Sequence, residues 1–170
     1  GLLSERTRMV GVVHASNVAG RSNYGKYVVV EHRLDGDAFY SVYAHLAEVT
    51  AKPGDPVKTG SVLGRMGYTG AGINRVRAHL HLELCLLMST RFEGWHTAFS
   101  GGTNFHGNFN GMNLAGMDIA TLFLEHRKNP ALRVQDFVTA TPAYFKVTVP
   151  REGDFDFAKR HAWMVKDAGS

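Results

Sequence analysis

Residues 79–83, His-Leu-His-Leu-Glu, carry the residue types and spacing that could most readily do chemistry. In a β-strand, successive side chains point to opposite faces. His79, His81 and Glu83 would therefore share one face of a strand. The leucines on the other face are expected to be buried against the core, and they are Leu80, Leu82 and Leu84.

Two imidazoles about 6.6 Å apart along a rigid strand can converge on one small volume. One of them could bind a metal while the other lies beside a reacting water molecule. Alternatively, both could bind, because His-x-His on a strand suits Zn²⁺ with bonds of about 2.0–2.1 Å. The plain alternative is a strand whose polar face only points to solvent.

His45 is the third candidate and ends another predicted strand, residues 39–45. Alternation predicts that Ser41, Tyr43 and His45 share one face of that strand. A lone histidine at a strand end is ordinarily exposed or satisfied by a hydrogen bond. His45 therefore gains catalytic meaning only if the fold brings it to the other two histidines.

Short β-strands are the elements that must position these residues. Runs of β-branched, aromatic and apolar residues predict strands at 9–14, 27–33, 39–45, 61–66 and 79–88. Glycine-rich turns separate them, and Asp35-Gly36 between two runs predicts a hairpin. Several short strands at regular spacing favour an antiparallel sheet or a barrel-like sandwich.

The chain changes character after residue 88 and predicts a C-terminal α+β extension. Residues 100–116 are rich in glycine and asparagine and predict an irregular loop, in which His106 could line a substrate cleft. A helix is predicted at 117–128, then a shorter one with Val134, Phe137 and Val138 inward, and a strand at 144–149. Trp95 and Trp163 are interpreted as packing residues.

Composition bounds the possible partners. The formal net charge is +4, but lysine and arginine are scattered, which argues against nucleic-acid binding. A mildly basic surface suits an anionic polymer such as a cell wall. No apolar run approaches the roughly 20 residues of a membrane span. The single cysteine, Cys85, cannot form an internal disulfide and is expected to be a small buried residue.

Five blocks of sequence, in order, resemble the lysostaphin-type metallopeptidases, also called LytM domains. They are residues 24–32 (YGKYVVVEH), 43–46 (YAHL), 54–60 (GDPVKTG), 64–70 (GRMGYTG) and 79–83 (HLHLE). The resemblance covers about residues 8–88. It implies a barrel-like β core over residues 1–90, with residues 91–170 as an extension.

The resemblance also implies a function and roles. The family consists of zinc endopeptidases that cut stem or cross-bridge peptides of peptidoglycan in the bacterial cell envelope. His81 corresponds to the zinc ligand, His79 to the base or water-orienting residue, and His45 to the residue that assists in the transition state. Tyr43, Arg77 and His106 are candidates for substrate binding, and Arg77 lies in a loop, 71–78, that is longer than usual for the family.

The family's other two zinc ligands come from an upstream His-x-x-x-Asp segment, and this sequence has none. A catalytic zinc site normally has three protein ligands. Because all three catalytic-site histidines are kept, we expect a shortened form of an active enzyme, with the remaining ligands upstream of residue 1. We expect the 170-residue chain itself to bind zinc weakly. No signal peptide is visible in residues 1–10, where Glu5, Arg6 and Arg8 occupy the place of an apolar segment.

Three other functions compete with this one. A catalytically degenerate envelope protein could bind or activate a separate cell-wall hydrolase. A biotinyl or sugar-phosphotransfer β domain shares the turn at 53–60, but it leaves the three histidines unexplained. A cupin-like metal enzyme uses His-x-His with a glutamate further along than Glu83.

Overall fold

The computed structural model describes residues 22–150 and 153–166. The chain divides into two compact units, Gly1–Gly116 and Met117–Ser170. The predicted strand at 9–14 lies outside the described residues. The division at residues 90 and 91, drawn from the family resemblance, stays a prediction.

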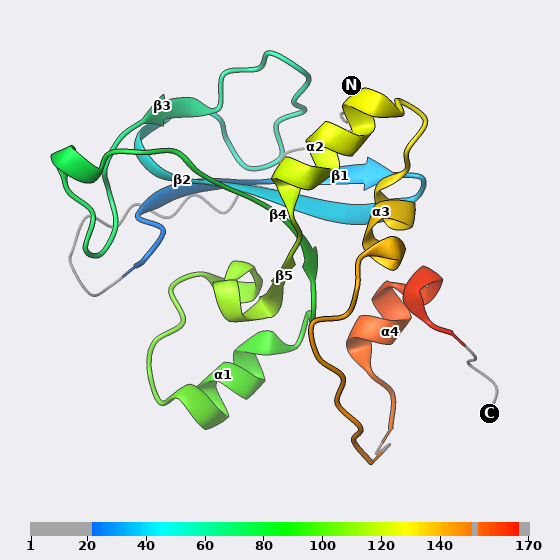
Figure 1. Cartoon of the computed structure of the whole chain (residues 1–170). Helices are drawn as coiled ribbons and strands as arrows, with labels where there is room; N and C mark the ends of the chain where they lie inside the picture. The colour runs from blue at the N-terminus through cyan, green and yellow to red at the C-terminus, as the bar shows by residue number, and fades with distance from the viewer. Residues whose placement is uncertain (1–21, 151–152, 167–170) are drawn as a thin grey trace. The chain divides into compact units, whose positions relative to one another are not determined.

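A long hairpin forms the centre of the first unit. Strand β1 (Lys26–Leu34) pairs antiparallel with β2 (Asp37–Val49), as Figure 1 shows. Asp35 and Gly36 join them with positive φ angles of 51° and 93°. Two positive φ angles give the turn a twist that matches the strands it connects, as expected for an Asp-Gly turn. The predicted hairpin is confirmed.

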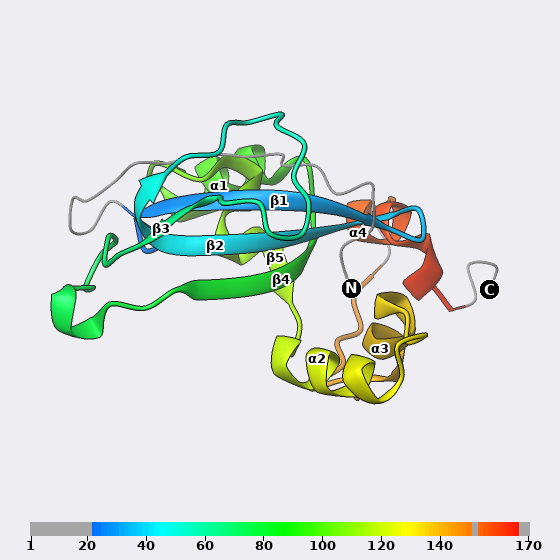
Figure 2. The same ribbon diagram turned by 90° about the horizontal axis from the view of Figure 1, so that it is seen from above.

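The other strands add to β2. Strand β4 (His81–Leu87) pairs with β2, and β5 (Leu114–Gly116) pairs with β4. The short β3 (Gly64–Met66) also pairs with β2, and every pairing is antiparallel. The strand order is β1-β2-β4-β5, and Figure 2 shows β1, β2 and β4 side by side. These strands do not close into a barrel. The predicted antiparallel, mainly β fold is confirmed.

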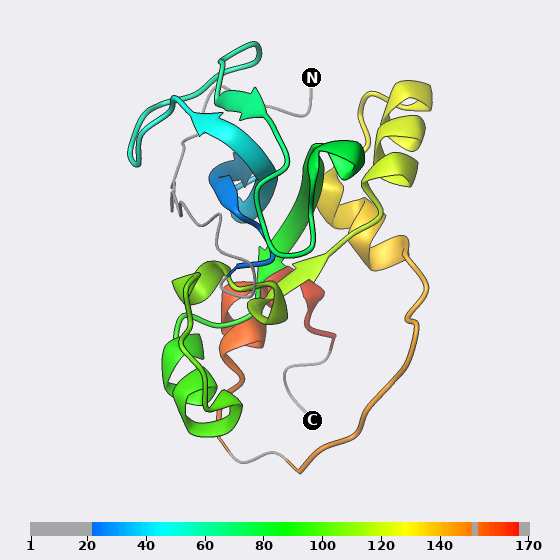
Figure 3. The same ribbon diagram turned by 90° about the vertical axis from the view of Figure 1, so that its left-hand side faces the viewer.

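Both faces of the sheet carry apolar clusters. One face holds a cluster around Tyr27, Val42 and Cys85, against which Phe109 packs. The other face holds Val28, Val30 and Leu46, which are packed by side chains from the segment that leads to β3. Figure 3 shows that segment and β3 on one side, with α1 (Phe92–Ser100) and the short turns after it on the other.

The prediction for the leucines of β4 was wrong. His81 pairs with Ala44, and Glu83 pairs with Val42, so the polar residues share a face with the Val42 cluster. Leu80 and Leu82 are instead 44% and 40% exposed. The register of β4 against β2 decides this, and alternation alone does not say which face of a strand is inward.

The residues after β4 differ partly from the prediction. The 100–116 loop contains two 3₁₀ turns, Gly107–Phe109 and Gly111–Asn113, and ends in β5. Helix α1 was not predicted. A further 3₁₀ turn, Arg75–Arg77, precedes β4.

The second unit is helical. Helices α2 (Ile119–Lys128) and α3 (Val134–Ala140) confirm the two predicted helices. Asp118 caps α2 by accepting from the Thr121 amide. The predicted strand at 144–149 is wrong, because that segment pairs with no strand and its residues are exposed. Helix α4 (Asp156–Arg160) and the turn Ala162–Met164 follow. No helix within the described ranges is both long and apolar enough to cross a membrane.

Candidate metal centre

Three imidazoles meet at one end of β2 and β4. His45, His79 and His81 each offer a ring nitrogen, and the three nitrogens lie within 4.8 Å of one another. The His45 ring centroid is 4.7 Å from that of His79 and 5.5 Å from that of His81. The structure therefore brings together the three histidines that the sequence singled out.

His45 reaches this cluster because β2 is irregular there. Its φ angle is 61°, and the pairing register between β1 and β2 shifts between Lys26 and Val28. A left-handed residue at such an irregularity breaks the alternation of side chains. The expectation that Tyr43 and His45 share a face was therefore wrong. Tyr43 packs with Val28 and Val30 on the opposite face.

Three hydrogen bonds fix His45 in this conformation. Its backbone N–H donates to the Tyr24 carbonyl at 2.9 Å, and its carbonyl accepts from the Gly67 N–H at 3.0 Å. Its ring Nδ1 donates to the Thr69 carbonyl at 2.8 Å. Both the backbone and the ring of His45 are thus held in place, and this fixes the direction of its Nε2.

Two glycines allow the loop that contains Thr69 to approach so closely. Gly25 has φ of 64°, and a Cβ there would lie 2.4 Å from the Thr69 carbonyl carbon. A Cβ on Gly70 would lie 2.5 Å from the Asn23 carbonyl oxygen. The absence of a side chain at both positions therefore lets the two backbone segments approach each other. A side chain at either glycine would displace the Thr69 carbonyl that orients His45.

His79 lies just before β4 and is exposed. Its Nδ1 donates to the Arg77 carbonyl at 2.7 Å. Asn74 caps the preceding 3₁₀ turn, because its side chain accepts from the amides of Val76 and Arg77. The turn thus presents the carbonyl that holds the His79 ring.

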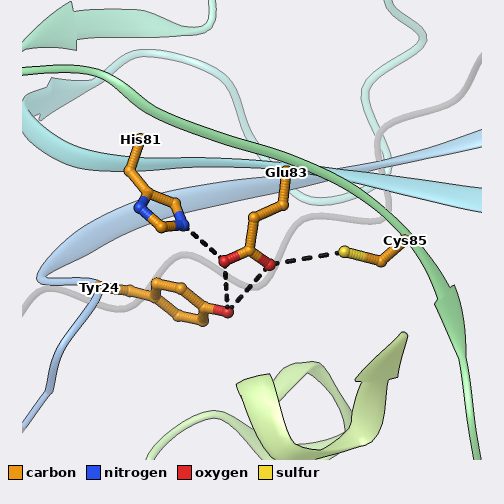
Figure 4. Close-up of polar contacts among 4 residues, drawn as sticks. All are labelled: Tyr24, His81, Glu83 and Cys85. Carbon is orange, nitrogen blue, oxygen red and sulfur yellow. Dashed lines mark hydrogen bonds and ion pairs between the residues drawn. The ribbon is translucent and has the colours of Figure 1, made fainter. Parts of the chain in front are cut away.

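Glu83 holds His81 from the other side. The His81 Nε2 lies 2.5 Å from Glu83 Oε1, and the Tyr24 hydroxyl donates to both carboxylate oxygens at 3.2 Å. The Cys85 thiol donates to Oε2 at 3.5 Å. Figure 4 shows the Glu83 carboxylate at the centre of these contacts.

Burial, reinforced by the Glu83 charge, raises the pKa of both the Tyr24 hydroxyl and the Cys85 thiol. Both groups therefore stay protonated and keep donating near neutral pH. Cys85 is a free buried cysteine, as predicted, but it also contributes to this network.

The imidazoles share a pattern that suits a metal. A carbonyl only accepts, so Nδ1 is the protonated nitrogen of His45 and His79, and Nε2 is left as an acceptor. In His81, Nε2 is bonded to Glu83, so Nδ1 is the nitrogen left as an acceptor. Histidines that bind metals characteristically donate their other ring N–H to a carboxylate or carbonyl. Burial also lowers the pKa of His45, which favours the neutral ring. The imidazoles therefore suit one wall of a zinc site, in which His81 supplies one of the three protein ligands that a catalytic zinc ion normally has.

The substrate-binding candidates are placed differently. Tyr43 is on the opposite face of the sheet from the cluster. The Arg77 guanidinium donates to the Gly72 carbonyl of its own loop. His106 lies 5.3 Å, ring to ring, from Tyr24. Their roles stay predictions. From the sequence alone, no role was assigned to Tyr24, which only begins the first block that resembles the family, and none to Glu83 as the partner of His81.

Comparison with known proteins identifies the family. Residues 7–91, half of the chain, match the model of peptidase family M23. This chain belongs to peptidase family M23. The predicted resemblance to lysostaphin-type peptidases is thereby confirmed, and the matched segment contains all three imidazoles of the cluster.

The comparison with solved structures gives a weaker likeness. The chain is 26% identical to an alanine-to-histidine mutant of the catalytic domain of EnpA, a prophage-encoded M23 protein from Enterococcus faecalis. The TM-score is 0.37, and the match covers 48% of this chain and 55% of that one. The chain thus spans about half of that domain. No curated protein matches the chain.

Proposed function

We propose that this chain is the catalytic part of a zinc-dependent endopeptidase that cleaves stem or cross-bridge peptides of peptidoglycan in a bacterial envelope. Membership of the M23 family supports the peptidase class. The observation that carries the proposal is the convergence of His45, His79 and His81, each oriented through its second ring nitrogen.

The three imidazoles would have different roles. His81, which alone has a carboxylate partner, would hold the ion. A bound zinc ion would polarise the scissile carbonyl and acidify a water molecule. The ring nitrogens of the three histidines lie within 4.8 Å of one another, so the other two rings would flank an ion held by His81.

His79 and His45 would move protons. The Nε2 of His79 would accept a proton from the attacking water, which suits an exposed ring fixed by the Arg77 carbonyl. His45 has its Nδ1–H engaged with Thr69, so its Nε2 must first be protonated before it can donate to a developing oxyanion. Both rings would act on the same bond from neighbouring positions.

Single alanine variants test these roles. Zinc affinity by titration calorimetry and peptide hydrolysis in excess zinc are measured for His45→Ala, His79→Ala and His81→Ala, with His126→Ala on α2 as the control. We expect His81→Ala to lose zinc affinity. We expect the other two site variants to keep it but to lose at least about 100-fold in turnover. The control should match the wild type.

Other outcomes would count against the proposal. Equal loss of zinc in all three site variants would show that every imidazole is a ligand. An unmodified protein that binds zinc but hydrolyses no peptide, and that instead activates a separate wall hydrolase, would contradict the peptidase and favour the degenerate regulator.

A further inference from the structure

A pocket lies beside the imidazole cluster, on the same face of the sheet. Its volume is about 500 Å³, within the roughly 300–1,000 Å³ usual for small-ligand sites. One wall is Ser22–Tyr24, ahead of β1, and the other comes from residues between Thr103 and Met112. The second wall lies beyond the residues that match the M23 family.

Asparagine side chains hold the second wall, the residues between Thr103 and Met112, in place. Asn104 accepts from the His106 amide and donates to the Gly107 carbonyl and to Glu93 on α1. Asn110 donates to Asn104 at 3.1 Å. The loop is thus tied to itself and to a helix, so the pocket is formed before any ligand arrives.

A second anchor joins this loop to the sheet. Asn113, which is 1% exposed, donates to the carbonyls of Ser89 and Asn108 and accepts from the Ser89 amide. Ser89 comes just after β4, the strand that carries His81. The second wall of the pocket and the His81 imidazole are therefore both attached to β4 or to the residues just after it.

The lining of the pocket is polar, and its described residues carry no carboxylate, ammonium or guanidinium group. Hydroxyl and amide groups come from Asn23 and Thr103, and from Ser22 and Asn110, which also bond within the protein. His106 adds an imidazole, and no lysine, arginine, aspartate or glutamate is among the described residues that line the pocket. Phe105, which is 39% exposed, adds an apolar surface. Groups of this kind recognise amides and small apolar side chains, whereas a charged ligand group would find no carboxylate, ammonium or guanidinium to pair with in this lining.

Tyr24 connects the pocket to the cluster. Its ring forms part of the pocket wall, 5.3 Å from His106 and 5.8 Å from His81, centroid to centroid. Its hydroxyl donates to Glu83, which holds His81. The Tyr24 side chain thus contacts both the pocket and the carboxylate that holds His81.

We propose that this pocket is a subsite for an uncharged, amide-bearing peptide segment that flanks the scissile bond. The inference rests on the proposed peptidase function for the identity of the ligand. Residues that follow the family core would then determine which peptides are accepted, while the core itself supplies the chemistry.

Binding of uncleaved peptides to the full chain tests the subsite without requiring turnover. The probes are acetyl-tetraalanine amide and two analogues in which one central alanine is replaced by glutamate or lysine. Titration calorimetry gives each Kd for the wild type, for Phe105→Ala and for Phe99→Ala. Phe99 is 76% exposed on α1 and outside the pocket, which makes it the matched control.

We expect the neutral peptide to bind at least about tenfold more tightly than either charged analogue. Phe105→Ala should weaken neutral-peptide binding about tenfold, and Phe99→Ala should leave it within twofold. Equal affinity for neutral and charged peptides, or equal effects of the two phenylalanine variants, would overturn the subsite. Binding that depends on Phe105, together with no peptide hydrolysis by the same chain in excess zinc, would instead refute the peptidase and leave the pocket standing.

Discussion

The two faces of the sheet each carry a histidine from a strand, and they use it in opposite ways. On one face, His81 is partly exposed and bonded to the carboxylate of Glu83. On the other, His32 is 4% exposed and bonded to the neutral hydroxyl of Ser41 at 2.7 Å. Its Nδ1 has no hydrogen-bond partner in the described part of the chain. The two strand histidines thus differ in partner and in exposure, although the residue type is the same.

The largest contrast should come from removing each histidine in turn. We expect His81→Ala to lower peptide hydrolysis at least about 1,000-fold while unfolding free energy changes by less than about 1 kcal/mol. His32→Ala should lower the unfolding free energy by about 2–3 kcal/mol and keep the activity of the folded fraction. Hydrolysis assays measure the activity of both variants, and urea denaturation measures their unfolding free energies. Loss of activity without loss of stability in His32→Ala would break the distinction.

Acid should sharpen the same contrast. Burial lowers the pKa of His32 from 6.5 to about 4. Between these values the unfolded chain binds a proton that the folded one does not, so stability falls as the pH falls. The shift predicts a loss of about 3 kcal/mol from pH 6.5 to pH 4. His32→Gln, measured by urea denaturation across this range, should lose that part of the slope, and an unchanged slope would refute the assignment.

The partners of the two histidines should also differ in their effect on metal binding. Glu83→Gln keeps the size of the side chain but removes the carboxylate that holds His81. We expect zinc affinity to fall about 10–100-fold, the usual effect of losing such a partner. Ser41→Ala, on the opposite face, should leave zinc affinity unchanged. Titration calorimetry measures the zinc affinity of both variants. An equal change in zinc affinity in Glu83→Gln and Ser41→Ala would show that Glu83 does not position His81.

The smallest effect concerns Tyr24. Tyr24→Phe keeps the ring beside His81 and removes the hydroxyl that donates to Glu83. Loss of one hydrogen bond to a carboxylate should lower the unfolding free energy by about 1–2 kcal/mol and zinc affinity by no more than about threefold. A zinc loss as large as that of Glu83→Gln would mean that the hydroxyl, and not the carboxylate alone, sets the orientation of His81.

The sequence was enough to predict the hairpin at Asp35-Gly36, the antiparallel sheet and the family. These depend on local turn chemistry and on ordered blocks of sequence. It was not enough to place His45, because alternation fails at a residue with positive φ. Alternation along the sequence also predicted wrongly that Leu82 points inward. Which face of β4 is inward depends on the register of β4 against β2, and the sequence does not give that register.

The loop after β4 escaped prediction for another reason. Its order comes from side-chain bonds of Asn104 and Asn113 to distant backbone groups. The same residue types in another setting would leave a loop without fixed structure. The pocket beside Tyr24 could therefore be found only in the folded chain.

The close approach at Gly25 and Gly70 also bears on the order in which this protein assembles. The loop that orients His45 docks through Thr69 on Lys26, 43 residues away along the chain. Closing so long a loop is slow, and it becomes favourable only after the hairpin that receives it has formed. The imidazoles should therefore come together late in folding. In the folded protein, brief detachment of this loop would disable the cluster while the sheet remains intact. Hydrogen exchange would record this as weaker protection at Gly67 than at Val42.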